Sequence, residues 1–382
     1  MDDPANADLL VQSAIGDFEC ALAQYVVATG LVSDELIDAQ FAAVGWDYDR
    51  RTITATGGPY ATATCGSIQV PGLYAPLSIA RFQADDALRR LEAWTDEQVP
   101  NRTDLIATAA AYAGYSLVLL GESMCSAALD VGPELTPAEL LSEAETRFTR
   151  AIETATVSGN TAILNMALAG RARARRGLGN LTGARTDAMQ IPEGFVHDAT
   201  YSEITFRREN LVNTQMYRGN FSSVGPAFRD LTFSGVPDPR VVVVATDLVG
   251  QDGATPIWQP AKYPTSSTPI PIASWDEAQL IIAEAELEAG NVQDAVDIIN
   301  VLHDRAGLPS FNSSDAQQVR SQIIEERSRE LFLEGHRLSD IIRYELPLVP
   351  PPGAPFPIKG GTYGDQLCFP LPDVERNNNP NI

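Results

Sequence analysis

The sequence predicts a mostly α-helical protein in which a layer of tetratricopeptide-like helical repeats supports irregular, loop-rich segments. Apolar residues recur at helical spacing over much of the chain, and Ala-rich helices are separated by short turns such as Ser158–Asn160. One turn recurs, because Gly-Asn-apolar-x-x-Ala occurs at 179–184 and at 290–295, each time after an Ala-rich helix. A Gly-Asn pair suits the left-handed cap between two helices. Paired helices of this kind build tetratricopeptide-like arrays.

The first region, residues 1–76, begins with an amphipathic helix at 7–29. From 46 to 74 the chain is rich in Gly, Thr, Tyr and Pro, so we expect a loop with at most a short strand. Long ordered loops in compact proteins tend to be functional.

The helical repeat units follow over residues 77–190. Small residues such as Ala144, Ala151 and Ala167 let neighbouring antiparallel helices approach closely. The expected helices are 77–94, 102–120, 136–156, 161–178 and a further start at 181–189.

A loop-rich insertion, residues 191–273, interrupts the repeats. It is dense in Pro, Gly and aromatic residues, with a short helical patch at 201–215 and one good strand candidate, VVVVAT, at 241–246. The C-terminal repeat unit and two signature helices follow over 274–345. Residues 346–382 form a tail, whose Pro- and Gly-rich part we expect to lie over the helices.

Residues 323–344 combine an apolar stripe with closely spaced charges. The pattern predicts one helix to Glu334, a break at Gly335 and a second helix to Tyr344. Charges so near a core normally persist because they pair. A catalytic carboxylate pair is the alternative, but no nucleophile or metal ligand accompanies it. We therefore expect a mostly buried, paired network at the helix junction, made up of Glu330, Glu334, Arg337 and Asp340.

The same stretch resembles the C-terminal signature of the SusD/RagB-like outer-membrane lipoproteins, in which Glu-Leu-x-x-Glu-Gly-x-Arg-x-x-Asp-Leu-x-Arg recurs. The matching residues are Glu330, Leu331, Glu334, Gly335, Arg337, Asp340 and Arg343, with Ile341 in place of the usual Leu. The family's closing motif, a proline-flanked hydrophobic segment before Asn-Pro, is similar to residues 368–382. The resemblance extends more weakly over most of the chain.

This resemblance implies a single SusD-like domain over residues 1–382 that binds a glycan or another nutrient, such as a peptide, at the cell surface. It implies delivery of that ligand to a TonB-dependent, SusC-like outer-membrane transporter, on which the protein lies as a lid. It also implies a native precursor attached to the outer membrane by a lipid anchor. Two other functions compete with this interpretation: a helical-repeat scaffold for protein interactions, and an extracellular glycoside hydrolase.

The charge, hydropathy and motif content of the chain exclude several classes of function. The chain has 27 Lys and Arg against 50 Asp and Glu, a net charge of −23, which argues against nucleic acid or an anionic membrane surface as partner. No apolar run approaches the roughly 20 residues that span a bilayer, and the residues after Met1 lack the basic and apolar regions of a signal peptide. The three histidines are far apart, and no catalytic or nucleotide-binding motif occurs. We therefore expect no enzyme activity, no metal and no cofactor.

Aromatic and polar residues in the first loop region and the insertion are the candidate ligand-binding residues. A ring on a loop can stack on the apolar face of a sugar while polar neighbours bond its hydroxyls. In the family these two regions bind glycans and converge on one face of the helical layer. The alternative is that these rings pack the insertion onto the helices. Trp258 is the foremost candidate, because nearby prolines stiffen its backbone. The full set is Trp46, Asp47, Tyr48, Arg50, Tyr74, Trp258, Gln259 and Tyr263.

The four cysteines form no C-x-x-C pair, so a zinc ribbon is not expected. An even number fits two disulfides or four buried thiols, and the residues alone leave both open. The exported location that the resemblance implies favours disulfides. We expect Cys20 to pair with Cys65 and Cys125 with Cys368, since each bridge would fix an irregular segment to a helix.

Overall fold

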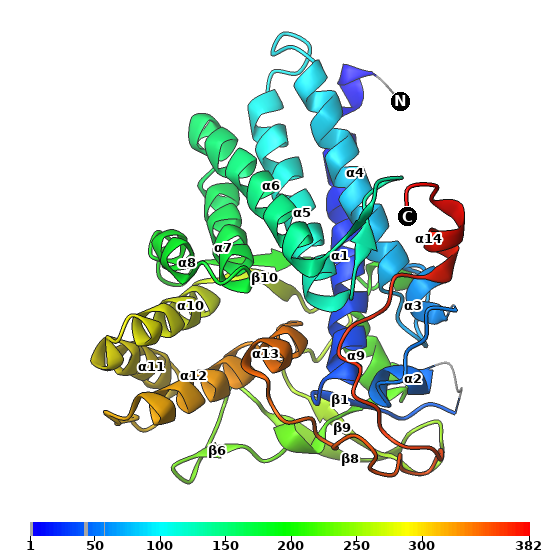
Figure 1. Cartoon of the computed structure of the whole chain (residues 1–382), viewed down its shortest axis with the longest axis vertical. Coiled ribbons are helices and arrows are strands. Elements are labelled where there is room, and N and C mark those ends of the chain that lie inside the picture. The colour runs from blue at the N-terminus through cyan, green and yellow to red at the C-terminus, as the bar shows by residue number, and fades with distance from the viewer. Residues whose placement is uncertain (1–2, 42–44, 57) are drawn as a thin grey trace.

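In the computed structural model, which describes residues 3–41, 45–56 and 58–382, helices form a curved layer and the irregular segments gather at one end of it (Figure 1). The long N-terminal helix α1 (Ala7–Val32) packs against α4 (Tyr74–Ala93) and α5 (Arg102–Ser123). The predicted mostly α-helical, tetratricopeptide-like fold is confirmed. The layer continues through α6 (Pro137–Ser158), α7 (Thr161–Gly177), α8 (Leu181–Ala188), α10 (Trp275–Glu288), α11 (Val292–Ala306), α12 (Ala316–Glu330) and α13 (Arg337–Tyr344).

The two Gly-Asn turns join the repeats in the conformation that the sequence predicts. Gly179, between α7 and α8, and Gly290, between α10 and α11, both have left-handed backbones, with φ of 77° and 87°. Although the insertion separates the two units in the sequence, α8 packs against α10. Small residues allow close contact, since a Cβ on Gly170 of α7 would lie 2.3 Å from the Phe148 ring of α6. The repeats therefore form one continuous layer.

Within the part of the chain that the structure describes, two helical segments are long and apolar enough to cross a membrane, a property that counting uninterrupted apolar residues did not reveal. They are Pro4–Val32 and Arg102–Ser123, and 83% of the apolar window of the first and 89% of the second are buried inside the protein. A helix that is covered on all sides is apolar all round. Both segments therefore serve as core helices.

The irregular segments contain short strands and turns. The segment between α1 and α4, which we call the first loop from here on, holds β1 (Leu36–Asp38), α2 (Trp46–Asp49) and α3 (Pro59–Thr62). β2 (Ala127–Ala128) and β3 (Glu134–Leu135) follow α5, and α14 (Asp373–Asn378) lies in the tail. The predicted helical patch becomes the short turns η3 (Phe206–Arg208), α9 (Leu211–Asn213) and η4 (Thr214–Arg218). The strands of the insertion are β4 (Val196–Ala199), β5 (Ser222–Val224), β6 (Thr232–Phe233), β7 (Val236–Pro237), β8 (Val243–Val249), β9 (Pro256–Pro260) and β10 (Ile270–Ser274).

These strands pair in antiparallel two-stranded ribbons: β1 with β5, β4 with β10, β2 with β3, β6 with β7 and β8 with β9. Only β8 overlaps the strand expected at 241–246. The expectation of a single good strand was wrong, because strands of two to five residues are too short to show an alternating pattern.

The helix before the signature glycine ends earlier than predicted. α12 ends at Glu330 rather than at Glu334, and residues 331–335 form a turn that leads to α13. Leu333 and Gly335 both have left-handed backbones, with φ of 55° and 82°. The Leu333 N–H donates to Glu35 Oε1 at 2.7 Å, so the turn is bonded to the segment between α1 and β1.

The four charged signature residues are paired, but not with one another. Glu334 and Asp340 are buried, whereas Glu330 and Arg337 are half-buried. The predicted single network was wrong, because the turn at 331–335 directs successive side chains toward different segments. The contacts are Glu330 with Arg240 (3.1 Å), Glu334 with Lys262 (2.6 Å), Arg337 with Asp34 (2.7 Å), and Asp340 with Arg327 (2.9 Å) and Arg176 (2.8 Å).

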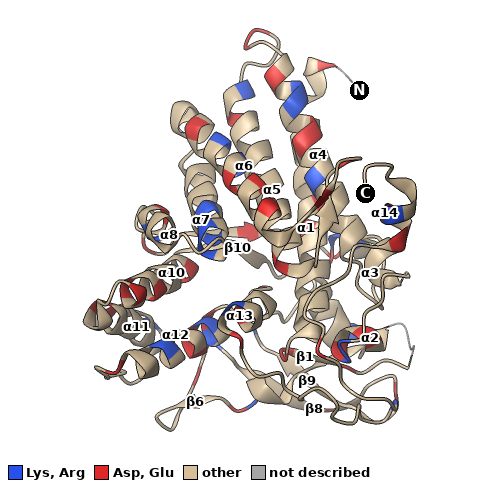
Figure 2. Cartoon of the chain, in the orientation of Figure 1, with Lys and Arg blue, Asp and Glu red and all other residues tan. Residues whose placement is uncertain are grey.

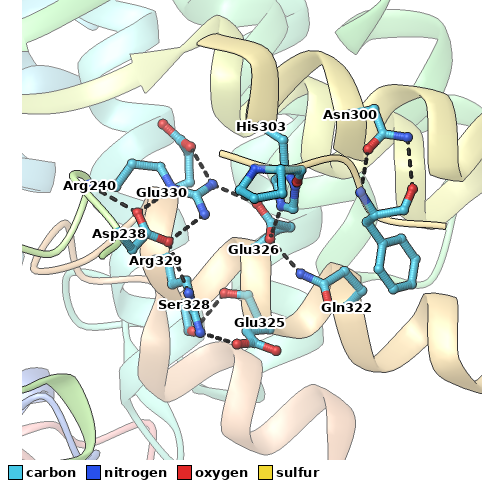
Figure 3. Close-up of polar contacts among 12 residues, drawn as sticks. Asp238, Arg240, Asn300, His303, Gln322, Glu325, Glu326, Ser328, Arg329 and Glu330 are labelled. Atoms are coloured by element: carbon cyan, nitrogen blue, oxygen red, sulfur yellow. Dashed lines mark hydrogen bonds and ion pairs between the residues drawn. The ribbon is translucent and has the colours of Figure 1, made fainter. Parts of the chain in front are cut away.

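One of these contacts belongs to a buried cluster that fixes the β6–β7 hairpin to α12 (Figure 3). Arg240 pairs with Asp238 (2.8 Å), Glu326 (2.6 Å) and Glu330, and Arg329 also contacts Asp238 (3.0 Å). Burial alone would raise the pKa of Asp238, but the hydrogen bonds and charge of Arg240 outweigh burial and lower that pKa to about 2. The hairpin is therefore held by an ionised carboxylate at any ordinary pH.

Two disulfides join irregular segments to the helices. Cys20 of α1 is bridged to Cys65, with the Cα atoms 5.9 Å apart, and Cys125 is bridged to Cys368, with the Cα atoms 5.0 Å apart. These are the two expected pairs. The first fixes the first loop to α1, and the second fixes the tail to the end of α5.

Replacing Arg337 with Ala should destabilise the protein by roughly 3–5 kcal/mol. Its guanidinium donates to both carboxylate oxygens of Asp34 at 2.7 Å, and the Asp34 side chain is only 7% exposed. Without the arginine, a buried carboxylate has no counter-charge. Urea unfolding followed by circular dichroism measures the difference in the free energy of unfolding.

Arg150→Ala is the matched control. Its ion pair with Glu92 at 2.9 Å is largely solvated, with the two side chains 40% and 43% exposed. That variant should unfold within about 1 kcal/mol of wild type. Equal losses in the two variants would mean that Asp34 is solvated and that the contact does not fix the turn to α1.

Candidate functional site

The first loop, the insertion and the tail meet at one end of the helical layer (Figure 1). β1 of the first loop pairs with β5 of the insertion, and β5 packs beside β9. Lys359 of the tail joins both segments: its Nζ donates to the backbone oxygen of Asp38 at 2.7 Å, contacts the Asp38 carboxylate, and lies 3.3 Å from Asp252 Oδ2. The two loop-rich regions expected to converge do so, and the tail joins them.

Arg51 fixes the tail from a second side. This arginine is 2% exposed, and its guanidinium donates to the backbone oxygens of Pro350 and of Gly364, the latter at 3.1 Å. Its Cζ also lies 5.0 Å from the centre of the Tyr363 ring. The planar guanidinium can bond two carbonyls and stack on a ring at once. The tail between residues 349 and 364 is therefore anchored by two buried cations.

These three segments enclose a pocket of about 290 Å³, which we call the junction pocket. The first loop supplies Ser33, Asp34, Leu36, Ile37, Asp38 and Asp49; the insertion supplies Pro226, Ala227, Thr255 and Pro256; the tail supplies Val349, Pro350, Phe356, Pro357, Ile358, Lys359 and Tyr363. The expectation that the tail lies over the helices missed these last residues. The only sequence signal was that the tail shares the Pro- and Gly-rich composition of the other two segments.

Burial controls the ionisation of the carboxyls at the pocket. It raises the pKa of Asp38 to about 6, although the charge of Lys359 acts in the opposite direction, and raises the pKa of Asp49 to about 7. Asp34, in turn, is paired with Arg337. Figure 2 shows that charged residues are frequent on the helices and sparse on β8 and β9. The pocket therefore carries little net charge near neutral pH.

Three of the predicted ligand-binding residues belong to the core. Tyr48 and Tyr263 are each 1% exposed, and their hydroxyls donate to Pro71 O at 2.8 Å and to Leu333 O at 3.0 Å. Tyr74, at the start of α4, is also buried. The prediction was wrong for these three, because a ring covered by the protein cannot stack on a ligand.

Trp46, Asp47 and Arg50 lie behind one wall of the pocket. The half-buried Trp46 donates its indole N–H to Gln40 O at 3.2 Å, and Lys359 Nζ lies 5.9 Å from the centre of its ring. Asp47 and Arg50 form an ion pair at 2.7 Å, and the Arg50 Cζ lies 5.7 Å from the centre of the Phe356 ring. These residues support Lys359 and Phe356, which line the pocket.

Trp258 and Gln259 lie on β9, next to the pocket. Side chains two residues apart on a strand point to the same side, so Trp258 shares a face with the pocket residue Pro256, about 7 Å away along the strand. The indole is half-buried, and the Cζ of Arg229 lies 4.7 Å from its ring centre. Gln259 is occupied, because its side-chain amide donates to Met216 O at 3.0 Å. The Trp258 ring packs partly against the hydrophobic core, and its half-buried position beside Pro256 makes it the one of the pair that remains a ligand-binding candidate.

Within the described residues, no group of three or more His, Cys, Asp or Glu side chains is arranged to hold a metal ion.

Replacing Lys359 with Met should loosen the tail around the junction pocket. The change keeps the length of the side chain but leaves Asp38 and Asp252 without the cation that joins them. Hydrogen–deuterium exchange followed by mass spectrometry should show faster exchange of amides in residues 349–363, because local opening becomes easier when a buried contact is lost.

Arg376→Met is the control for this experiment. Arg376 also belongs to the tail and pairs with Glu134 at 2.7 Å, but its side chain is 42% exposed. Exchange in residues 349–363 should match wild type in that variant. If Lys359→Met also exchanges like wild type, Lys359 does not anchor the tail.

Comparison with known proteins shows which solved structures share this architecture. A model of the SusD family matches residues 277–366, the region that contains the charged signature. A SusD superfamily protein from Bacteroides vulgatus ATCC 8482 is similar over 99% of this chain and 97% of its own, with a TM-score of 0.74 and 16% identity. No curated protein matches the chain.

Two further solved structures have the same fold. A SusD-like carbohydrate binding protein from Bacteroides vulgatus ATCC 8482 is similar over 100% of this chain and 97% of its own, with a TM-score of 0.72 and 15% identity. A SusD-like carbohydrate binding protein from Bacteroides fragilis NCTC 9343 is similar over 100% of this chain and 99% of its own, with a TM-score of 0.70 and 16% identity.

Proposed function

We propose that this chain is a SusD/RagB-like protein that captures a saccharide at the junction pocket and the neighbouring Trp258, and that it delivers the saccharide to a TonB-dependent outer-membrane transporter. The carrying observation is the pocket itself, which three irregular segments enclose, with Trp258 two residues along β9 from the lining residue Pro256. An indole stacks on the apolar face of a sugar ring. The solved relatives described as carbohydrate binding proteins support this choice of ligand.

The proposal is one of binding without catalysis. A glycoside hydrolase needs two carboxyl groups that face the scissile bond, one as acid and one as base or nucleophile. At the junction pocket, both oxygens of Asp34 accept from Arg337, and Asp38 is paired with Lys359. Asp49 accepts the Asp38 N–H at 2.8 Å. Carboxyls engaged in this way favour a structural role over acid–base chemistry.

Replacing Trp258 with Ala should weaken glycan binding by at least about tenfold, because a few aromatic side chains usually carry most of the binding free energy. A glycan array identifies the strongest ligand of the wild-type protein, and calorimetry compares its affinity for the two proteins. Trp94→Ala is the matched control, because Trp94 is also half-buried but caps the far end of α4. An array without any bound glycan, or equal affinity in wild type and Trp258→Ala, would remove the basis for a saccharide site here.

The proposed partner is a SusC-like transporter, engaged by a broad face of the helical layer, which leaves the junction pocket accessible to ligand. In its native setting the protein would be held at the cell surface by a lipid anchor. Purification of the tagged protein from native outer membranes should bring a TonB-dependent barrel with it. Recovery of the protein without such a barrel, under detergent conditions that preserve other outer-membrane complexes, would count against this partner.

A further inference from the structure

The wall of the junction pocket is mostly apolar. Its nonpolar lining comes from all three segments, and four of these residues are prolines, whose rigid rings keep the walls in place. The nonpolar residues are Leu36, Ile37, Pro226, Ala227, Pro256, Val349, Pro350, Phe356, Pro357 and Ile358. Val349 and Ile358 remain 54% and 61% exposed, so the apolar lining continues to the pocket's rim.

The polar groups of the lining already have partners within the protein. The Ser33 hydroxyl donates to Gly30 O at 3.1 Å, and the Thr255 hydroxyl donates to Asp252 Oδ2 at 2.6 Å. Tyr363 is hydrogen-bonded to Asp49. The charged groups are engaged as well, since Asp34 is paired with Arg337 and Lys359 with Asp38.

Among the buried side-chain atoms of the lining, one acceptor is without a partner within the described residues. Asp38 Oδ1 is buried without a hydrogen-bond partner. It lies 3.1 Å from the position that a Cβ would take on Gly45, which is outside the pocket lining. Among the described residues, the side-chain donors of the lining are therefore engaged, and the hydrogen bonds left for a ligand are those that acceptor oxygens can still receive.

A sugar ring does not suit such a surface. Most hydroxyls that enter would lose their bonds to water and meet an apolar wall instead, which is unfavourable. An apolar group gains free energy by the same transfer. Size permits this, because a dry apolar cavity of about 150 Å³ already binds benzene, and the junction pocket measures about 290 Å³.

We infer that the junction pocket binds an apolar substituent, an aromatic ring or a branched aliphatic group, of the saccharide whose sugar part lies on Trp258. This inference rests on the proposed function and names the ligand class: a glycan that carries an aryl or acyl group. The continuity of Pro256 and Trp258 along one face of β9 connects the two parts of such a ligand. A peptide with an apolar side chain would share the pocket chemistry but not the need for Trp258.

The test compares three probes by saturation-transfer NMR: phenol, phenyl β-glucoside and methyl β-glucoside. Wild-type protein should saturate the aryl protons of the first two, and methyl β-glucoside should not displace phenol. Val349→Asp places a charge at the rim and should weaken phenol and phenyl β-glucoside by about tenfold or more. Val244→Asp is the matched control, because Val244 is 51% exposed on β8 and lies outside the pocket lining.

The outcomes separate this inference from the proposed function. Aryl signals that are absent in wild type, or equal in wild type and Val349→Asp, overturn the inference even if a Trp258-dependent glycan is found. Displacement of phenol by methyl β-glucoside overturns it too. Aryl binding that depends on Val349, together with an apolar peptide that binds independently of Trp258, overturns the saccharide function and assigns the pocket to peptide ligands. Two results together support both the inference and the proposed function. Val349→Asp loses aryl binding while Val244→Asp keeps it, and a glycan is found whose binding depends on Trp258.

Discussion

A charge removed from water must meet an opposite charge, and in this protein that requirement connects segments that are far apart in the sequence. Asp34 at the end of α1 meets Arg337 at the start of α13, Glu334 meets Lys262 of the insertion, and Glu330 meets Arg240 beside the β6–β7 hairpin. Such pairs contribute little net stability compared with apolar packing, but breaking one is costly. Their effect is to favour one arrangement of these segments. The charges around the turn at 331–335 find their partners only when the end of α1 and the insertion are both in position.

The candidate site depends on the same constraint. Of the pocket's walls, β1 is held by its pairing with β5, whereas the tail residues of the wall belong to no strand or helix among the described residues. Lys359 and Arg51 supply the missing connections, because each bonds backbone oxygens as well as charged or aromatic neighbours from another segment. With its polar groups used in holding the walls together, the pocket is left with an apolar interior. The structural role of the charges and the proposed ligand preference thus have one origin.

The sequence predicts the parts of this structure that depend on local patterns. Helical spacing places most helices of the layer, and the repeated Gly-Asn turn identifies the two units that α8 and α10 bring together. Trp258 and Tyr263 show where such reasoning ends: both are aromatic residues of the same proline-rich stretch, yet one is half-buried on β9 and the other donates to Leu333 in the core. Which face of a loop is buried depends on segments that are distant in the sequence but pack against it in the folded protein. For the same reason, the partners of the signature charges and the contribution of the tail to the pocket leave no local pattern to read.

The two disulfides differ in when they can form as the chain is made. Cys20 and Cys65 are separated by 45 residues and can meet while the rest of the chain is still emerging, whereas Cys125 must wait for a partner 243 residues later. During that interval three thiols are available before the fourth. Early closure of the first bridge removes two of them and leaves Cys125 with a single remaining partner. The order of emergence therefore guards against mispairing, and it makes closure of the tail over the junction one of the last events in maturation.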